Sequence, residues 1–296
     1  MKRILIILII IAVIGFVFFF GRDFFIPKKS VSGRLQVTTS FYPLYFFTKE
    51  IAGDKADVYN ITPAGAEPHD YDLTTQDLAR IEDSNLLVLN GKRLESWGEK
   101  IKDVLLGTDT KVVTVGEIGQ IANDPHVWLD PVLARSEVET IKNGLILVDS
   151  ANASYYESNA ANLLARLENL DAEFRSGLFK CEKKDFITTH AAFGYLAGQY
   201  GLSQVAISGF SPDEEPSAEK LAATVNFARK NQVKYIFFET LISPKLAETI
   251  AHETGAETLV LNPLEGLSDV EIKNGRNYFT EMEKNLANLM LALVCR

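Results

Sequence analysis

The chain has 296 residues and a mass of 32.9 kDa, which is more than one hydrophobic core usually organises and predicts roughly two domains. With 47% hydrophobic and 23% charged residues, its composition excludes a disordered or collagen-like chain, and its 2 cysteines exclude a Cys-built zinc module or an iron–sulfur protein. Residues 1–33 carry a net charge of +4, which leaves −13 on the rest of the chain. Such an acidic body is expected to repel nucleic acid and is compatible with a cationic ligand.

An unbroken apolar run from Ile4 to Phe20 follows the basic residues Lys2 and Arg3. As a helix it would span about 25 Å, the lower limit for crossing a bilayer. The preceding positive charges predict an export signal with the rest of the chain translocated. Because no A-x-A-like cleavage site follows, an uncleaved membrane anchor with a tether to residue 33 is favoured over a cleaved signal. The body is therefore expected in the periplasm or on the outer face of the cell membrane.

Outside the cytoplasm the two cysteines, Cys181 and Cys295, can oxidise. We predict a disulfide between them because an exported pair of free thiols is a liability, although two unpaired thiols are the alternative.

Short runs rich in β-branched and aromatic residues alternate with helical patterns from residue 35 onward. The predicted strands are Gln36–Thr39, Val58–Ile61, Leu86–Leu89 and Val112–Val115, and then Phe186–Thr189, Gln204–Ser208, Tyr235–Phe238 and Thr258–Leu261. The predicted helices between them include Leu44–Ala52, Leu73–Glu82, Lys220–Lys230 and Pro244–Thr254. This alternation predicts an α/β protein with two parallel sheets and helices on both faces of each.

Between the two sets of strands, Pro131–Lys180 shows no strand signal. Apolar residues such as Leu163, Leu167 and Phe174 recur there at helical spacing, which predicts a helix of about seven turns over Ala151–Leu178. A helix this long is better suited to join two lobes rigidly than to cross a small sheet. The expected division is an anchor and tether at 1–33, a first lobe at 34–150, a connector at 151–182 and a second lobe at 183–296.

Three of the 4 histidines, His69, His126 and His190, fall where predicted strands end. Ligands of open α/β sheets bind at the carboxyl ends of the strands, so all three imidazoles are expected at one edge. A lone histidine in a loop is more often a surface or capping residue, but three at one edge in two lobes indicate a metal site. Asp70 and Asp124 are candidate partners for the second ring nitrogens.

A tetrahedral site needs a fourth ligand, and Glu265 follows the last predicted strand. Glu239, at the end of the preceding strand, and Glu67, two residues before His69, are competitors. Three imidazoles and one carboxylate suit Zn²⁺, whereas Ca²⁺ and Mg²⁺ prefer all-oxygen sites.

Several segments together resemble the metal-binding solute-binding proteins of ABC transporters, the ZnuA/TroA-like family. They are Glu67-Pro68-His69-Asp70-Tyr71, Asp124-Pro125-His126-Val127-Trp128-Leu129-Asp130-Pro131, Thr189-His190-Ala191-Ala192-Phe193-Gly194-Tyr195, Ser211-Pro212-Asp213-Glu214-Glu215-Pro216-Ser217 and Asn262-Pro263-Leu264-Glu265-Gly266-Leu267. The match runs in order from about residue 36 to the C-terminus.

The resemblance implies two Rossmann-like lobes joined by a long helix, with one metal between them held by His69, His126, His190 and Glu265. It implies a monomer that binds zinc, catalyses no reaction and delivers the ion to an ABC permease and its ATPase. Manganese members tend to carry an acidic residue at the position of His190, which favours zinc here. Some members place an aspartate at the position of Asn262, so the carboxylate role passes to Glu265.

The chain departs from the family in two places. Residues 116–123 form a short segment without the His-rich loop of many zinc members, and the segment Asn90-Gly91-Lys92-Arg93-Leu94-Glu95 departs from the family's usual Gly-rich turn. His252 matches no motif and is expected on the surface.

Two alternatives stay open. One is a Mn²⁺- or Fe²⁺-binding transporter component or surface adhesin on the same scaffold. The other is an exported zinc hydrolase, for which Glu67 or Glu239 could act as general base, although no H-E-x-x-H or G-x-S-x-G motif is present.

Overall fold

The computed structural model describes residues 33–91 and 94–296. The apolar run that predicts a membrane anchor lies outside them. Among the described residues, none of the helices combines the length and the apolar character that a membrane span requires.

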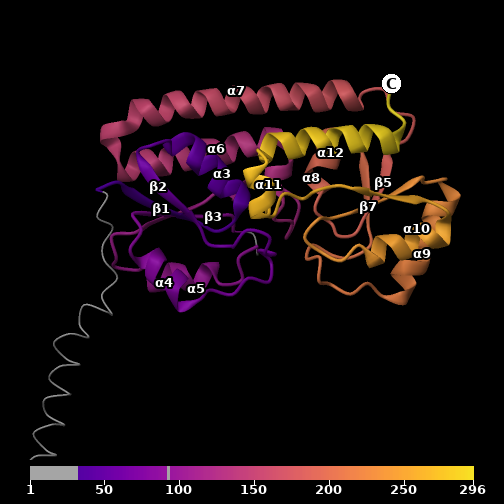
Figure 1. Cartoon of the computed structure of the whole chain (residues 1–296), viewed down its shortest axis with the longest axis horizontal. Coiled ribbons are helices and arrows are strands. Elements are labelled where there is room, and N and C mark those ends of the chain that lie inside the picture. The colour runs from indigo at the N-terminus through magenta and orange to yellow at the C-terminus, as the bar shows by residue number, and fades with distance from the viewer. Residues whose placement is uncertain (1–32, 92–93) are drawn as a thin grey trace, which may run out of the picture. The chain divides into compact units, whose positions relative to one another are not determined.

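The first lobe is a parallel four-stranded sheet in the order β2-β1-β3-β4. Its elements are β1 Leu35–Thr39, α3 Tyr42–Ala52, β2 Ala56–Asn60, α4 Thr75–Glu82, β3 Leu86–Leu89, α5 Gly98–Val104 and β4 Lys111–Thr114. All four residues of β3, Leu-Leu-Val-Leu, are buried, as expected for a central parallel strand covered on both faces. In Figure 1, α3 and α6 lie above this sheet and α4 and α5 lie below it.

The second lobe repeats this topology with the order β6-β5-β7-β8. Its elements are β5 Asp185–Thr188, α8 Gly194–Gln199, β6 Ser203–Ala206, α9 Ala218–Lys230, β7 Tyr235–Phe238, α10 Lys245–Thr254 and β8 Glu257–Val260. The expected two-lobed α/β fold is confirmed. In both lobes the strand order reverses beside the first strand, and ligands of such sheets bind at this switch point.

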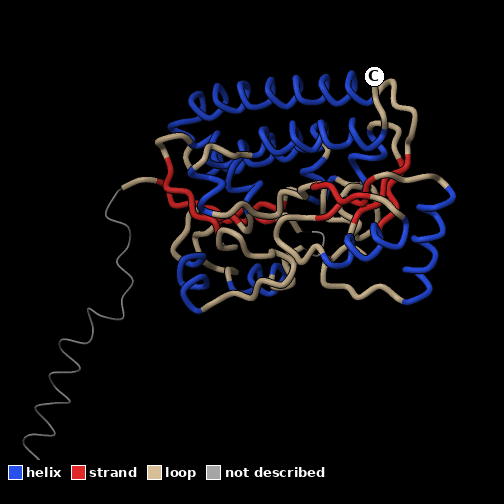
Figure 2. Tube along the Cα trace, turned by 45° about the vertical axis from the view of Figure 1, so that its right-hand side comes forward, coloured by secondary structure: helices blue, strands red, loops and turns tan. Residues whose placement is uncertain are grey.

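A layer of long helices spans both lobes (Figures 1 and 2). It contains α6 Pro131–Val148, α7 Ala153–Leu178 and α12 Tyr278–Leu293, with the short α11 Asp269–Lys273 before α12. The buried stripe of α7 includes Leu163, Leu167, Leu170 and Phe174, the residues whose spacing predicts the connector. These side chains belong to the largest hydrophobic cluster, which contains residues of both lobes. The helix layer therefore shares its core with the two sheets.

Most elements match the sequence-based expectation to within two residues. The strands Leu86–Leu89 and Tyr235–Phe238 have the predicted bounds. α4 begins at Thr75 rather than Leu73 because Thr74 and Asp77 form a capping box, in which each side chain bonds the other residue's backbone N–H.

The predicted disulfide between Cys181 and Cys295 is confirmed. It joins the segment after α7 to the segment after α12, and the two cysteines also form an isolated antiparallel bridge. The bond therefore fastens the last helix to the connector.

Glu137 on α6 is fully buried, and neither of its carboxyl oxygens has a hydrogen-bond partner among the described residues. Burial raises its pKa well above the ordinary value. The unfolded chain ionises this group at about pH 4.5, whereas the folded chain keeps it protonated, so folding stability falls as pH rises above that point.

We therefore expect Glu137→Gln to remove part of the loss of stability between pH 5 and pH 8. The parent can lose up to about 1.4 kcal/mol per pH unit through this group until its folded-state pKa is reached. Urea unfolding of both proteins at the two pH values measures the effect. If the free energy of unfolding depends on pH equally in parent and variant, the pKa of Glu137 in the folded protein is the ordinary one.

Candidate metal centre

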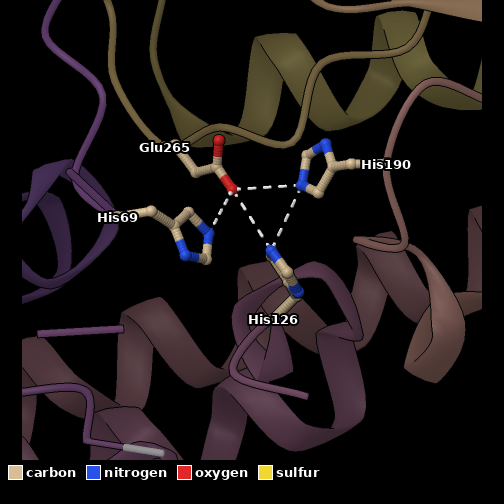
Figure 3. Close-up of side chains that lie close together, drawn as sticks. All are labelled: His69, His126, His190 and Glu265. Atoms are coloured by element: carbon tan, nitrogen blue, oxygen red, sulfur yellow. Dashed lines mark hydrogen bonds and ion pairs between the residues drawn. The ribbon is translucent and has the colours of Figure 1, made fainter. Parts of the chain in front are cut away.

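The four residues predicted as ligands come together at one point (Figure 3). His69 lies between β2 and α4, and His126 lies between β4 and α6. His190 follows β5, and Glu265 follows β8. All four loops leave the carboxyl ends of strands, two in each lobe, as the sequence predicts.

The donor atoms all lie within 4.8 Å of one another, and four of their six separations are close to the edges of a small tetrahedron. The Oε1 atom of Glu265 lies 3.3 Å from Nε2 of His69, 3.2 Å from Nε2 of His126 and 3.4 Å from Nε2 of His190. The Nε2 atoms of His126 and His190 are 3.3 Å apart. Zinc bonds of about 2.0–2.1 Å to four tetrahedral ligands give edges of about 3.3–3.4 Å. The donor set therefore has the chemistry of a closed zinc site, and Glu265 lies at a zinc-like separation from each of the three imidazoles.

Burial makes this group an electrostatically coupled unit. His126 and His190 are 0% exposed and Glu265 is 1% exposed, whereas His69 is partly exposed. Burial alone would lower the pKa of His190, but the charges of Glu239 and Glu265 outweigh it and hold this pKa well above the ordinary value. Burial alone would raise the pKa of Glu265, but His190 and the hydrogen bonds of the imidazoles hold it well below. The histidine and the carboxylate therefore stabilise each other's charged forms in the buried site.

Carboxylates contact the second ring nitrogen of two of the three histidines. Asp124 Oδ1 accepts hydrogen bonds from Nδ1 of His126 at 2.8 Å and from its backbone N–H at 3.0 Å, which is the role predicted for Asp124. Nδ1 of His190 forms an ion pair with Oε1 of Glu239 at 2.6 Å. A proton held at Nδ1 leaves the lone pair of Nε2 directed at the site. Asp70, the other predicted partner, instead shares a hydrogen bond with Asp213, which raises the pKa of Asp70 to about 6.

The loop that carries Glu265 is held by buried amides. Leu264 has a left-handed backbone with φ of 57°, and its N–H donates to Oδ1 of Asn262 at 2.8 Å. Asn285 on α12 holds the backbone of Asn262 from both sides, with bonds of 2.8 Å and 2.7 Å. Asn262 thus shapes the turn that presents Glu265 rather than reaching the site itself.

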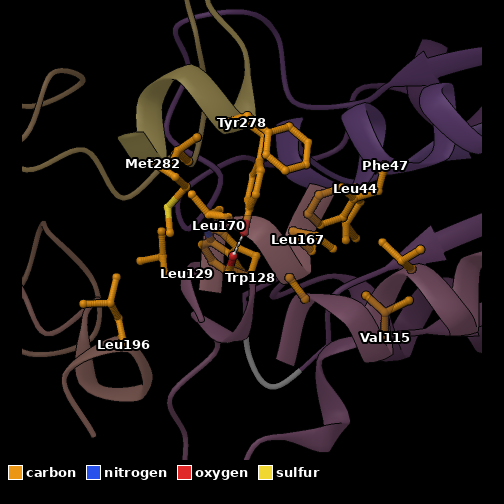
Figure 4. Packing of buried hydrophobic residues seen from close by; sticks show 14 of the residues in the cluster. Leu44, Phe47, Val115, Trp128, Leu129, Leu167, Leu170, Leu196, Tyr278 and Met282 are labelled. Atoms are coloured by element: carbon orange, nitrogen blue, oxygen red, sulfur yellow. Dashed lines mark hydrogen bonds between the residues drawn. The ribbon is translucent and has the colours of Figure 1, made fainter. Parts of the chain in front are cut away.

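Trp128 ties this loop to the segment that carries His126. Its indole N–H donates to the carbonyl of Pro263 at 2.7 Å, and the hydroxyl of Tyr278 donates to the carbonyl of Trp128 at 2.6 Å (Figure 4). The relative position of His126 and Glu265 is therefore set by the protein.

Glu239 and Glu67, the two competitors for the fourth ligand position, contact other groups. Glu239 lies on the far side of the His190 ring from the other ligands and also accepts a hydrogen bond from Thr189. Glu67 accepts from the backbone N–H of His69, and its burial together with the charge of Glu265 raises its pKa to about 9. Among the described residues, the donor atoms that lie within 4.8 Å of one another come from the three histidines and Glu265, not from Glu239 or Glu67.

Sequence reasoning gives Glu239 only as a competing ligand or general base and Trp128 only as a member of a motif, and it does not name Asn285. One signal is available for Asn285: it is a polar residue on the apolar face of the last helix and is 1% exposed. A buried amide of this kind requires partners.

The family described as "Zinc-uptake complex component A periplasmic" matches residues 37–292. The chain belongs to this family. It is 42% identical to the high-affinity zinc uptake system protein ZnuA of Bacillus subtilis, over 90% of each chain. It is 41% identical to the zinc-binding lipoprotein AdcA of Streptococcus pneumoniae over 88% of this chain, which spans 56% of the length of that relative.

Solved structures share the fold. The Zn(II)-bound ZnuA-like domain of Streptococcus pneumoniae AdcA is 42% identical, with a TM-score of 0.80 over 88% of this chain and 99% of that chain. The laminin-binding protein Lmb of Streptococcus agalactiae is 35% identical, with a TM-score of 0.81 and the same coverage. Family members of this type are solute-binding components of transport systems.

Proposed function

We propose that this chain captures Zn²⁺ between its two lobes and delivers it to an ABC permease and its ATPase. The observation that carries the proposal is the convergence of three imidazole nitrogens on one carboxylate oxygen, which lies 3.2–3.4 Å from each of them, with all four donor atoms within 4.8 Å of one another. The family of the chain and the zinc-related names of its relatives agree with it.

The proposed ligands are His69, His126, His190 and Glu265. Glu265 is favoured over Glu239 and Glu67 because its Oε1 atom is the carboxylate oxygen that lies within 3.4 Å of all three Nε2 atoms. Glu239 orients the ring of His190, and Asp124 orients the ring of His126.

Capture requires no bond-making chemistry beyond coordination. In the metal-free protein a proton on His190 neutralises Glu265, and Zn²⁺ displaces this proton because a ligating imidazole must be neutral. His69 is the least buried of the four proposed ligands, and we propose that the ion enters past it. The shared hydrophobic core of the helix layer limits any opening to a modest movement.

The location and partners of the chain follow from the same proposal. The disulfide Cys181–Cys295 supports an oxidising compartment, in agreement with a periplasmic or cell-surface position. The N-terminal apolar run would hold the protein at the membrane beside its permease. We propose that the chain acts as a monomer and has no catalytic activity.

A hydrolase is disfavoured by the fourth protein donor, since catalytic zinc sites usually keep that position for water. A Mn²⁺ or Fe²⁺ carrier is disfavoured because three imidazoles suit Zn²⁺ better than harder ions. Surface attachment is the second candidate, favoured by the similarity to Lmb, which is described as a bifunctional protein with adhesin and metal transporting activity.

Metal analysis tests the proposal. The purified full chain, kept in mild detergent, is exposed to an equimolar mixture of Zn²⁺, Mn²⁺, Fe²⁺ and Mg²⁺ and then freed of loosely bound ions. We expect about one zinc per chain and little of the other metals. Uptake of manganese or iron in preference to zinc, or of no metal, would overturn the proposal.

A further inference from the structure

Tyr195, on α8 of the second lobe, holds the loop of the first lobe that leads to His126. Its hydroxyl oxygen accepts a hydrogen bond from the N–H of Ile121 at 3.1 Å. Its single hydroxyl proton is shared between the carbonyl oxygens of Ile121 at 3.1 Å and Asp124 at 3.3 Å. The side chain is 7% exposed, so these bonds are shielded from water.

Apart from its hydrogen bonds with Tyr195, the loop of residues 120–123 is exposed to solvent. The side chains from Gln120 to Asn123 lie at the surface, and Asn123 adopts a left-handed backbone with φ of 62°. Burial begins abruptly at Asp124. A short surface loop with few buried side chains has little local stability, so a contact at its end determines where the following residues lie.

Two glycines make room for this contact. A side chain at Gly119 would lie 2.2 Å from the hydroxyl of Tyr195, and one at Gly194 would lie 2.9 Å from Oδ2 of Asp124. The phenol ring and the start of α8 therefore lie directly against the loop.

The contacts close a ring across the boundary between the lobes. Tyr195 and His190 belong to one segment of the second lobe. Tyr195 holds the backbone of Asp124, the Asp124 side chain holds the ring of His126, and Nε2 of His126 lies 3.3 Å from Nε2 of His190. Each contact in this closed series limits the distance between His126 and His190.

We infer that Tyr195 is a positioning residue that fixes His126 against His190 from the opposite lobe and thereby sets how slowly the ion is released. The inference rests on the proposed function. Tyr195 contacts backbone atoms two or more residues from His126 and none of the donor atoms. Its effect is therefore expected on dissociation, because affinity differences between closely related variants appear mostly in the dissociation rate.

Zinc release from the full chain in mild detergent tests this inference. The zinc-loaded protein is mixed with excess chelator in a stopped-flow instrument, and the variants are Tyr195→Phe and the control Tyr200→Phe. Tyr200 is also buried, and its hydroxyl bonds Asp171 of α7 rather than the loop. We expect Tyr195→Phe to speed dissociation roughly tenfold with an unchanged association rate, as for other groups that orient metal ligands. Tyr200→Phe should release zinc at the parental rate.

Faster release in Tyr195→Phe, with a thermal midpoint of the metal-free protein close to that of Tyr200→Phe, supports the inference. Parental release rates in Tyr195→Phe, or equal acceleration in Tyr195→Phe and Tyr200→Phe, would overturn it. A parent chain that binds no zinc would instead overturn the proposed function.

Discussion

Replacing Glu265 with alanine should weaken zinc binding by roughly 100- to 1,000-fold. A structural zinc ion is bound with about 10–16 kcal/mol, so each of four ligands accounts for roughly 2.5–4 kcal/mol. Glu265 is also the anionic ligand, and its oxygen lies within 3.4 Å of all three imidazole nitrogens. Competition with a fluorescent zinc chelator measures the loss.

Two further variants serve as controls for Glu265→Ala. Glu239→Ala removes the partner of the His190 ring and should weaken binding only about 10- to 100-fold. His252→Ala, on the surface of α10, should leave binding unchanged. A larger loss in Glu239→Ala than in Glu265→Ala would mean that the two carboxylates have each other's roles.

Removing the disulfide should destabilise the protein by about 4–5 kcal/mol. The bond closes a loop with a sequence separation of 114, and the chain-entropy model gives about 4.7 kcal/mol for a loop of 100 residues. For a domain of this size the thermal midpoint of Cys181→Ser/Cys295→Ser should fall by roughly 10–15 °C. Thermal unfolding of the metal-free proteins gives the value.

Zinc stoichiometry of the same double variant is the internal control. The cysteines lie beyond the ends of α7 and α12, whereas the four ligands lie in loops at the strand ends, so one zinc per chain is still expected. A midpoint equal to that of the parent would show that the bond adds nothing to stability.

The sequence predicts the fold well because the relevant signals are local. Buried strands such as Leu86–Leu89 are short apolar runs, and the stripe of α7 repeats with the period of a helix. The ligands are predictable for a related reason. Loops at the carboxyl ends of parallel strands converge, so residues such as His69 and Glu265 can be placed together from their order along the chain alone.

The surroundings of the ligands are less predictable because they depend on contacts between distant segments. Glu239 reaches His190 from a neighbouring strand 49 residues away in sequence, and its role depends on the register of β5 and β7. Asp70 directly follows His69 and Asp124 precedes His126 by two residues, yet only Asp124 is turned toward its histidine. Asp70 instead faces Asp213 of the other lobe. Side-chain direction of this kind is set by packing across the two lobes.

The central claim is that His69, His126, His190 and Glu265 together hold one zinc ion. A crystal structure of the zinc-loaded protein, with anomalous data collected on both sides of the zinc absorption edge, tests it most directly. We predict a single strong zinc peak bonded to three Nε2 atoms and to Oε1 of Glu265, at about 2.0–2.2 Å from each. A peak bonded to Glu239 or Glu67 in place of Glu265, or located away from these four residues, would contradict it.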